Sequence, residues 1–428
     1  MSLQLDRLRR ADGVVGGAVD AFAGGEHRLR LGHRVERIER SEGGWSLSYR
    51  ADGRLESESF PYVIIASGRY CEPRIPEIAG LETFSGAGGV THAFYYRDPN
   101  QFRGQRVLVG GCGISAVEVA PEIAIAGAQR VVSCMRRQRY ILPRIVAGRP
   151  IDSLLFNRYL ALVNERLPLK VFGENLKALI LRTSGTPQQW GAQKADDDPL
   201  VAGVTHAQLY LPLIAEGKIV SKPWIGSIAG QRVTFENNTA EEFDAILLAT
   251  GFKISLPFLS PEIADIIDAS GPALRLYRHT FHPQLPGLAF VGMFHQAGAY
   301  FPPLELQGRW ITYAWAGLCR VPGEEEMAQE ISLHQASEAP LRMNDVCIRF
   351  ARAAGVEPDP EQWPELKRAL LFGPLAPVSF RLSGPDALPD AAERLMAGAA
   401  ELDGLASPRL TAAEDAQLRT LETDAVPG

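Results

Sequence analysis

The chain has 428 residues, of which 46% are hydrophobic and 22% are charged, and the length predicts two to three domains at about 150 residues each. The net charge of −6 provides no basic surface for nucleic acid. Since the sequence has neither an apolar run of about 18 residues nor an apolar leader after Met1, we expect a soluble, cytoplasmic protein without a membrane segment.

The first patterned segments predict strands. Residues 29–50 alternate between apolar and polar side chains and are interrupted at Ser41–Gly44, which is typical of antiparallel strands. The apolar run in residues 60–68, FPYVIIASG, indicates a strand buried on both faces of a parallel sheet. Residues 71–90 are rich in Pro and Gly and are expected to form a crossover loop.

A compact βαβ unit begins near residue 104. We expect a strand at Arg106–Val109, a glycine-rich turn, a helix at Ser115–Ala126 and a second strand at Arg130–Met135. The unit has about 30 residues, the size of a parallel crossover.

The turn of this unit, residues 111–116, has the sequence GCGISA and fits the pattern GxGxxA. The first glycine permits a tight turn, the second lets the backbone approach a pyrophosphate, and the small third residue lets helix and strand pack closely. The free N–H groups at the start of the helix suit phosphate oxygens. The pattern predicts a dinucleotide site, with a tight turn that binds nothing as the alternative. The predicted binding residues are Gly111, Gly113, Ile114, Ser115 and Ala116.

The end of the second strand selects between the two nicotinamide dinucleotides. An NAD site usually has an acidic residue there, whereas this chain has Arg136 and Arg137, which suit a 2′-phosphate. We therefore expect NADPH. The alternative is a solvated basic edge that also includes Arg139 and Arg144.

Residues 151–215 have helical patterns and are interpreted as a helical insertion, after which strand patterns return in residues 217–235 and 243–251. After Gly323 the chain is mostly amphipathic helix.

The five cysteines are scattered, and no pair has CxxC spacing. A disulfide framework, a zinc site and a disulfide reductase of the thioredoxin-reductase type are therefore disfavoured. His279 and His282 have no third ligand nearby in sequence, so we predict no metal site.

Several further segments occur in a fixed order between residues 29 and 390. They are ASG at Ala66–Gly68 with EPRIPEIAGLETFSG, then THAFYYRD, VLVGGCGISAVE, DAILLATGF, LYRHTFHPQLPGLAFVG and LELQGRW. Together they resemble the flavin-containing monooxygenases and their Baeyer–Villiger relatives.

The resemblance implies an α/β fold with two dinucleotide-binding domains, one for FAD and one for NADPH. Members of the family begin with a strand and a GxGxxG turn for FAD, whereas Gly13, Gly16 and Gly17 do not form GxG, so we expect an incomplete FAD domain. The implied domains are a remnant of the FAD domain (1–97), a Rossmann-like NADP-binding domain (98–251) with a helical insertion at about 145–217, a return to the FAD domain (252–330), and a helical C-terminal extension and tail (331–428).

The family motif FxGxxxHxxxY corresponds here to Phe84, Gly86, His92 and Tyr96, with two extra residues between the glycine and the histidine. His92 is expected to be either a cofactor contact or a buried structural histidine. A tyrosine at the last position, where Baeyer–Villiger enzymes have tryptophan, favours the branch that oxygenates nitrogen or sulfur.

The resemblance also assigns residues to the cofactors. The ASG and ATG segments resemble the linkers between the two domains, Gly292 and Gln307 resemble positions near the flavin, and Val35 resembles the residue that meets the adenine edge. The residues of the two linkers are Ala66, Ser67, Gly68, Ala249, Thr250 and Gly251.

The implied activity is an NADPH- and FAD-dependent insertion of one O₂-derived oxygen into an amine nitrogen or a sulfur, through a flavin C4a-hydroperoxide. The partners are then a small-molecule substrate and O₂, with a homo-oligomer as an option. The protein holds the cofactors and excludes water, so no catalytic acid or base is nominated. The alternatives are an NADP-binding pseudoenzyme without flavin and a Baeyer–Villiger monooxygenase.

Overall fold

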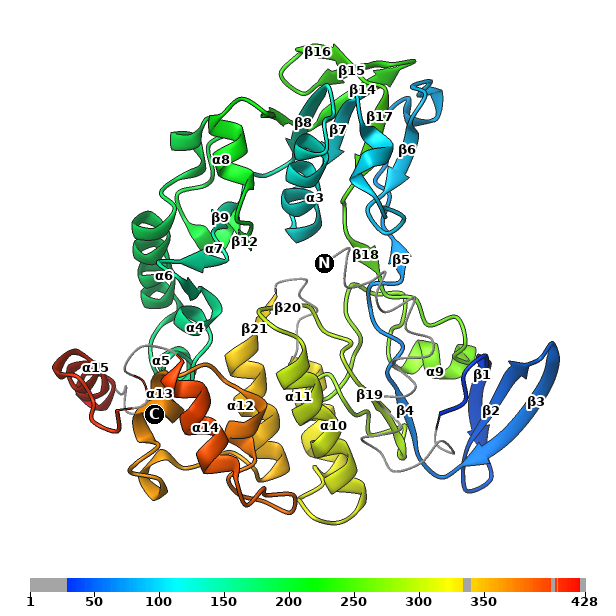
Figure 1. Ribbon diagram of the computed structural model, residues 1–428. Helices are drawn as coiled ribbons and strands as arrows, with labels where there is room; N and C mark the ends of the chain where they lie inside the picture. Colours follow the sequence, from blue (N-terminus) through cyan, green and yellow to red (C-terminus); the bar gives the residue numbers. More distant parts are fainter. Residues whose placement is uncertain (1–28, 334–339, 402–404, 406, 424–428) are drawn as a thin grey trace. The chain divides into compact units, whose positions relative to one another are not determined.

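The computed structural model describes residues 29–333, 340–401, 405 and 407–423 (Figure 1). The described residues divide into two compact units, and the chain passes between them several times. The first unit contains residues up to 63 together with 70–136 and 216–269, and the second contains 64–69, 137–215 and the residues from 270 onward.

A five-stranded parallel sheet forms the centre of the first unit, with the strand order β13-β8-β7-β17-β6. The strands are β6 (Gly89–His92), β7 (Arg106–Gly110), β8 (Arg130–Met135), β13 (Ile219–Pro223) and β17 (Ala245–Leu248). Every residue of β17 is buried, as expected for a central strand covered on both faces.

The predicted βαβ unit is confirmed. Helix α3 (Ile114–Ile125) connects β7 to β8 and lies against the sheet in Figure 1. A small antiparallel sheet contributes to an apolar cluster in which Leu108, Val132 and Ile246 pack with Phe235. This second sheet consists of β14 (Ile225–Ala229), β15 (Arg232–Phe235) and β16 (Ala240–Glu242).

The antiparallel strands expected in residues 29–50 are also confirmed. Strands β1 (Arg34–Ser41) and β2 (Gly44–Ala51) pair across the predicted turn, and a third strand, β3 (Arg54–Phe60), extends the sheet. The predicted loop at 71–90 is only partly correct. The remaining elements of this unit are β5 (Glu72–Pro73), η2 (Leu81–Thr83), η3 (Pro99–Phe102), β18 (Phe252–Lys253) and α9 (Pro261–Ile266).

The expected strand in FPYVIIASG is shorter and less buried than predicted. Strand β4 (Val63–Ile65) pairs only with β19 (Leu288–Phe290) among the described strands. Val63 and Ile65 are buried, but Ile64 is 39% exposed. The prediction of burial on both faces was therefore wrong for Ile64, because only the face of β4 that carries Val63 and Ile65 is covered.

The second unit is mainly helical, as predicted for the region after Gly323. Helix α10 (Phe301–Trp315) packs on α12 (Met343–Ala354), and the rings of Trp310 and Phe350 stack with centroids 5.8 Å apart. Its other elements are β20 (Gln296–Ala297), α11 (Glu324–Leu333), β21 (Leu341–Arg342), η5 (Pro360–Gln362), α13 (Lys367–Phe372), η6 (Pro377–Phe380), α14 (Ala391–Ala400) and α15 (Ala412–Thr423).

The helical pattern of residues 151–215 is confirmed. The segment 137–215, which also contains short strands, belongs to the second unit although it lies between β8 and β13 in sequence. Its helices are α4 (Asp152–Leu155), α5 (Arg158–Arg166), α6 (Leu169–Thr183), η4 (Pro187–Trp190), α7 (Pro199–Ala202) and α8 (Tyr210–Ala215). Its strands are β9 (Tyr140–Leu142), β10 (Ile145–Val146), β11 (Arg149–Pro150) and β12 (Val204–His206).

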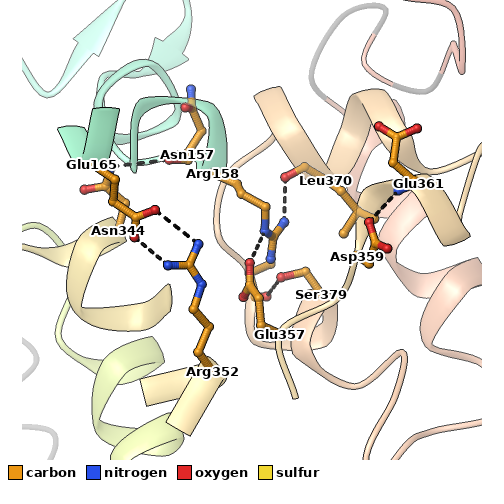
Figure 2. Close-up of polar contacts among 11 residues, drawn as sticks. Asn157, Arg158, Glu165, Asn344, Arg352, Glu357, Asp359, Glu361, Leu370 and Ser379 are labelled. Atoms are coloured by element: carbon orange, nitrogen blue, oxygen red, sulfur yellow. Dashed lines mark hydrogen bonds and ion pairs between the residues drawn. The ribbon is translucent and has the colours of Figure 1, made fainter. Parts of the chain in front are cut away.

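A buried arginine attaches the insertion to the C-terminal helices (Figure 2). Nε of Arg158 donates to Oε1 of Glu357 at 2.7 Å, and Nη1 donates to the carbonyl of Leu370, in α13, at 2.6 Å. The Arg158 side chain is 2% exposed. A second ion pair, Arg352 to Glu165, links α12 and α5 at the surface.

No helix in the described ranges has the length and hydrophobicity needed to cross a membrane. Gly13, Gly16 and Gly17, on which the expectation of a missing FAD fingerprint rests, lie outside the described residues. The domain boundaries inferred from the sequence stay a prediction.

Candidate functional site

The parallel sheet brings the predicted nucleotide-binding segments to one edge, because all its strands end there. The first residues after β7 and β17 are hydrogen-bonded to neighbouring strands: Gly111 N donates to Cys134 O at 2.8 Å, and Ala249 N donates to Gly110 O at 2.7 Å. The segments that meet at this edge contain His92, Gly111, Arg136 and Ala249.

The turn after β7 requires small residues at its first and third motif positions. Gly111 has φ of 131°, and a Cβ there would overlap the carbonyl oxygen of Ala249. The same Cβ would lie 3.5 Å from that of Ala116, which is fully buried. The strand-to-helix turn is therefore as tight as a dinucleotide site demands.

The start of α3 is open. Its N-cap residue is Gly113, which has no side chain to accept hydrogen bonds from the first N–H groups, and no described atom lies within 4 Å of where its Cβ would be. Ile114 is 46% exposed, and Ser115 is half-buried. Free N–H groups and the positive end of the helix dipole fit the pyrophosphate of a dinucleotide.

Arg136 follows β8 at the same edge. Its guanidinium lies 5.1 Å from the ring centroid of Trp224, and that ring would lie 3.4 Å from a Cβ placed at Gly110. Arg136 is therefore held beside the glycine turn by a cation–π contact. Arg137, the next residue, is exposed and is the first residue of its segment in the second unit. Sequence reasoning missed Trp224, which stands in no recognisable motif.

His92 is a buried histidine at the end of β6. Its Nδ1 accepts a hydrogen bond from the N–H of Phe94 at 3.1 Å, and its ring meets Phe252 edge to face at 5.2 Å. Burial lowers the pKa of His92, while the backbone of Gly251 acts in the opposite direction. The imidazole is therefore neutral near pH 7.

The other residues of the same motif make packing contacts. The Tyr96 hydroxyl donates to Oε2 of Glu122, in α3, at 2.9 Å, and burial followed by this hydrogen bond raises the pKa of Tyr96 far above its usual value. Phe84 packs against the apolar cluster under the sheet, and a Cβ at Gly86 would lie 2.5 Å from the carbonyl oxygen of Asp244. The motif thus fastens the segment before β7 to the sheet.

The remaining residues that were assigned to the cofactors fall in both units. In the first unit, Thr250 Oγ1 donates to the Arg74 carbonyl at 2.5 Å, and Gly251 O accepts from Arg74 N at 2.9 Å. Ala249–Gly251 is thereby tied to the segment after β5. Val35 lies in β1, is 37% exposed and adjoins a β-bulge.

In the second unit, the structure brings Gly292 and Gln307 together. Oε1 of the fully buried Gln307 accepts from Gly292 N at 2.9 Å. Val291 N donates to Ile65 O at 2.9 Å, so the segment that begins at Ala66 lies beside Gly292. Ala66, Ser67 and Gly68 are exposed.

Comparisons with known proteins give the family. A family model described as flavin-binding monooxygenase-like matches residues 35–402. Dimethylaniline monooxygenase [N-oxide-forming] 2 of Rattus norvegicus is 30% identical over 366 residues, which cover 81% of this chain and 67% of that protein.

Two solved structures share the fold. The S-allyl-L-cysteine S-oxygenase of Allium sativum has a TM-score of 0.54 at 19% identity, covering 94% of this chain and 73% of that one. Cyclohexanone monooxygenase bound to ε-caprolactone has a TM-score of 0.58 at 17% identity, covering 79% and 81%. The fold is that of the flavoprotein monooxygenases with two dinucleotide-binding domains. The chain belongs to the flavin-containing monooxygenase family, whose enzymes use FAD and NADPH.

Proposed function

We propose that this chain, with NADPH and FAD bound, inserts one oxygen atom of O₂ into an amine nitrogen or a sulfur of a small molecule. The observation that carries the proposal is the glycine turn before α3. A Cβ at Gly111 would overlap Ala249, and the helix start at Gly113 is open to a pyrophosphate.

Arg136 supports NADPH over NADH. Its guanidinium follows β8, where a dinucleotide site contacts the ribose, and Trp224 restrains its orientation. A planar, permanently charged guanidinium can bind a phosphate through two hydrogen bonds. Arg137 is proposed as a second contact with the 2′-phosphate on the strength of its sequence position alone.

The bound cofactors would supply the reducing equivalents and the oxygen-transfer chemistry, and the protein would orient them and exclude water. His92 is buried and neutral, and the phenol of Tyr96 is engaged with Glu122. Neither side chain is proposed as a proton donor. Their proposed task is to hold the segment before β7 against the sheet, so that the edge with Gly111 keeps its shape.

Nitrogen or sulfur is proposed as the acceptor because of Tyr96 and because of the relatives. The rat relative carries the description N-oxide-forming, and the Allium sativum neighbour is an S-oxygenase. The cyclohexanone monooxygenase neighbour represents the Baeyer–Villiger alternative.

The test begins with the purified full chain. We expect FAD to bind with the visible absorption band of a flavoprotein, NADPH to bind more tightly than NADH, and N,N-dimethylaniline or a thioether to accelerate NADPH oxidation with formation of the N-oxide or S-oxide. NADPH binding without any FAD binding would refute the proposal in favour of an NADP-binding pseudoenzyme. Conversion of cyclohexanone to the lactone, without N- or S-oxide, would favour the Baeyer–Villiger reaction.

A further inference from the structure

A strained turn precedes β19 in the second unit. Arg278 and His279 have φ of 44° and 56°, in the left-handed region that side chains with a Cβ disfavour. The turn is closed by hydrogen bonds from Tyr277 N to Phe281 O at 2.7 Å and from Thr280 N to Tyr277 O at 2.9 Å. Such a conformation persists only where the surroundings hold it in place.

The amide of Gln307, in α10, provides this restraint. The two N–H groups of its Nε2 are shared among three acceptors, Thr280 Oγ1 at 2.8 Å, Phe290 O at 3.0 Å and His279 O at 3.1 Å. The Thr280 hydroxyl in turn donates to Arg278 O at 2.8 Å. Gln307 and Thr280 have no exposed surface, so water cannot replace these contacts.

The other end of the same amide holds Gly292. Gln307 Oε1 accepts from Gly292 N at 2.9 Å, and Gly292 has φ of 74°. A Cβ at Gly292 would lie 3.0 Å from Leu304 Cδ2, so the backbone here packs closely against α10. One buried amide thus connects the strained turn to the glycine that follows β19.

We propose that Gln307 is a positioning residue, which holds the Arg278–His279 turn in its strained form and thereby fixes the backbone at Gly292. The relevance of Gly292 to FAD rests on the proposed function. Loss of the amide would let the turn relax and would release the Gly292 N–H. The backbone that faces the cofactor would then change, and the effect of Gln307 on FAD binding would be indirect.

The first test measures coupling between the amide and the strain, and it needs no cofactor. Glycine adopts positive φ without strain, so an Arg278→Gly/His279→Gly chain has a turn that needs no restraint. We expect Gln307→Leu to lower the Tm less in this glycine background than in the native chain. The contacts that the two glycine substitutions remove are missing both with and without Gln307→Leu, so their effect on the Tm cancels in this double-mutant cycle.

Gln296→Leu is the matched control. Gln296 is also a buried glutamine of the second unit, and its Nε2 donates to one carbonyl, that of Ala299, at 2.6 Å. Its replacement should lower the Tm equally in both backgrounds. Equal losses for Gln307→Leu in the two backgrounds would overturn the proposal.

The second test follows Gly292 and FAD. Gln307→Leu should accelerate hydrogen exchange at the Gly292 amide, and Gln296→Leu should not. FAD should bind about tenfold more weakly to Gln307→Leu than to Gln296→Leu, with partial recovery in the glycine background. Unchanged exchange at Gly292, or equal FAD affinity in the two leucine variants, would contradict the positioning role. If the native chain binds no FAD, the proposed function fails, while the Tm cycle and the exchange rates still decide whether Gln307 holds the turn.

Discussion

Replacing Arg158 by methionine should destabilise the second unit far more than replacing Arg352, although both arginines join α5 to the C-terminal helices (Figure 2). Arg158 and Glu357 are 2% and 16% exposed, whereas Arg352 and Glu165 are 48% and 45% exposed. The two pairs therefore have the same charges in very different solvent environments.

The expected magnitudes follow from this difference. Arg158→Met leaves the Glu357 carboxylate buried without its cation and removes the hydrogen bond to the Leu370 carbonyl, so the free energy of unfolding should fall by about 3–5 kcal/mol. Arg352→Met removes a solvent-screened pair and should cost about 0.2–1 kcal/mol. Methionine has a similar length and flexibility, which limits the cavity left by either substitution.

The assay is urea unfolding followed by circular dichroism, with the midpoint and slope measured for each variant. The double variant Arg158→Met/Glu357→Gln should be more stable than Arg158→Met, because it removes the unpaired buried charge. If Arg158→Met costs no more than Arg352→Met, or if Glu357→Gln brings no recovery, burial does not determine the importance of this pair.

Three further predictions concern the edge of the parallel sheet that contains His92, Gly111 and Arg136. Gly111→Ala should weaken NADPH binding by about tenfold or more in fluorescence titrations, because the new Cβ would overlap Ala249 O. Arg136→Ala/Arg137→Ala should weaken NADPH by about tenfold relative to NADH, since NADH lacks the 2′-phosphate. Burial lowers the pKa of His92 in the folded chain, so the unfolded chain takes up a proton on this histidine at a higher pH than the folded chain does. The free energy of unfolding is therefore unaffected by His92 above about pH 6.5 and decreases as the pH falls below it. Between about pH 7.5 and about pH 5.5, the Tm of the His92→Gln variant should therefore decrease less than the Tm of the native chain.

Each of these predictions has an outcome that contradicts it. A Gly111→Ala variant that binds NADPH as tightly as the native chain would refute the steric argument, because its new Cβ would overlap Ala249 O. An unchanged NADPH to NADH ratio in the double arginine variant would remove the 2′-phosphate assignment. An identical pH dependence of the Tm with and without His92 would mean that other groups account for it.

Strands β7 and β17 of the central sheet were predictable because they are continuous apolar runs, and the turn after β7 was predictable because it fits a motif. The segments VLVG and AILL are buried over their whole length, and GCGISA specifies the turn by residue size. Strand β3 was not predictable in the same way, because its sequence RLESESF is mostly charged and polar, and its pairing with β2 supplies the order.

The contacts of the candidate site were less predictable than its residues. Gln307 and Gly292 were nominated from a resemblance, but the strain at Arg278 and His279 was not foreseeable, since φ follows from hydrogen bonds to a helix nearly 30 positions later in the chain. The cation–π contact of Arg136 with Trp224 likewise joins the residues that follow β8 and β13, which are far apart in sequence. Local patterns report local conformation, and these contacts are tertiary.

The membership of residues 137–215 in the second unit has a consequence for protein engineering. These residues interrupt the five-stranded parallel sheet in sequence, yet α5 packs on α12 and α13. A chimera that exchanges residues 98–251 as one cassette would import an α5 surface that has not evolved with the host's C-terminal helices. Swapping 98–136 and 216–251, and leaving the insertion with its native helices, would preserve both apolar cores. The segments of this chain that can be exchanged together are therefore those that pack against one another, whether or not they are contiguous in sequence.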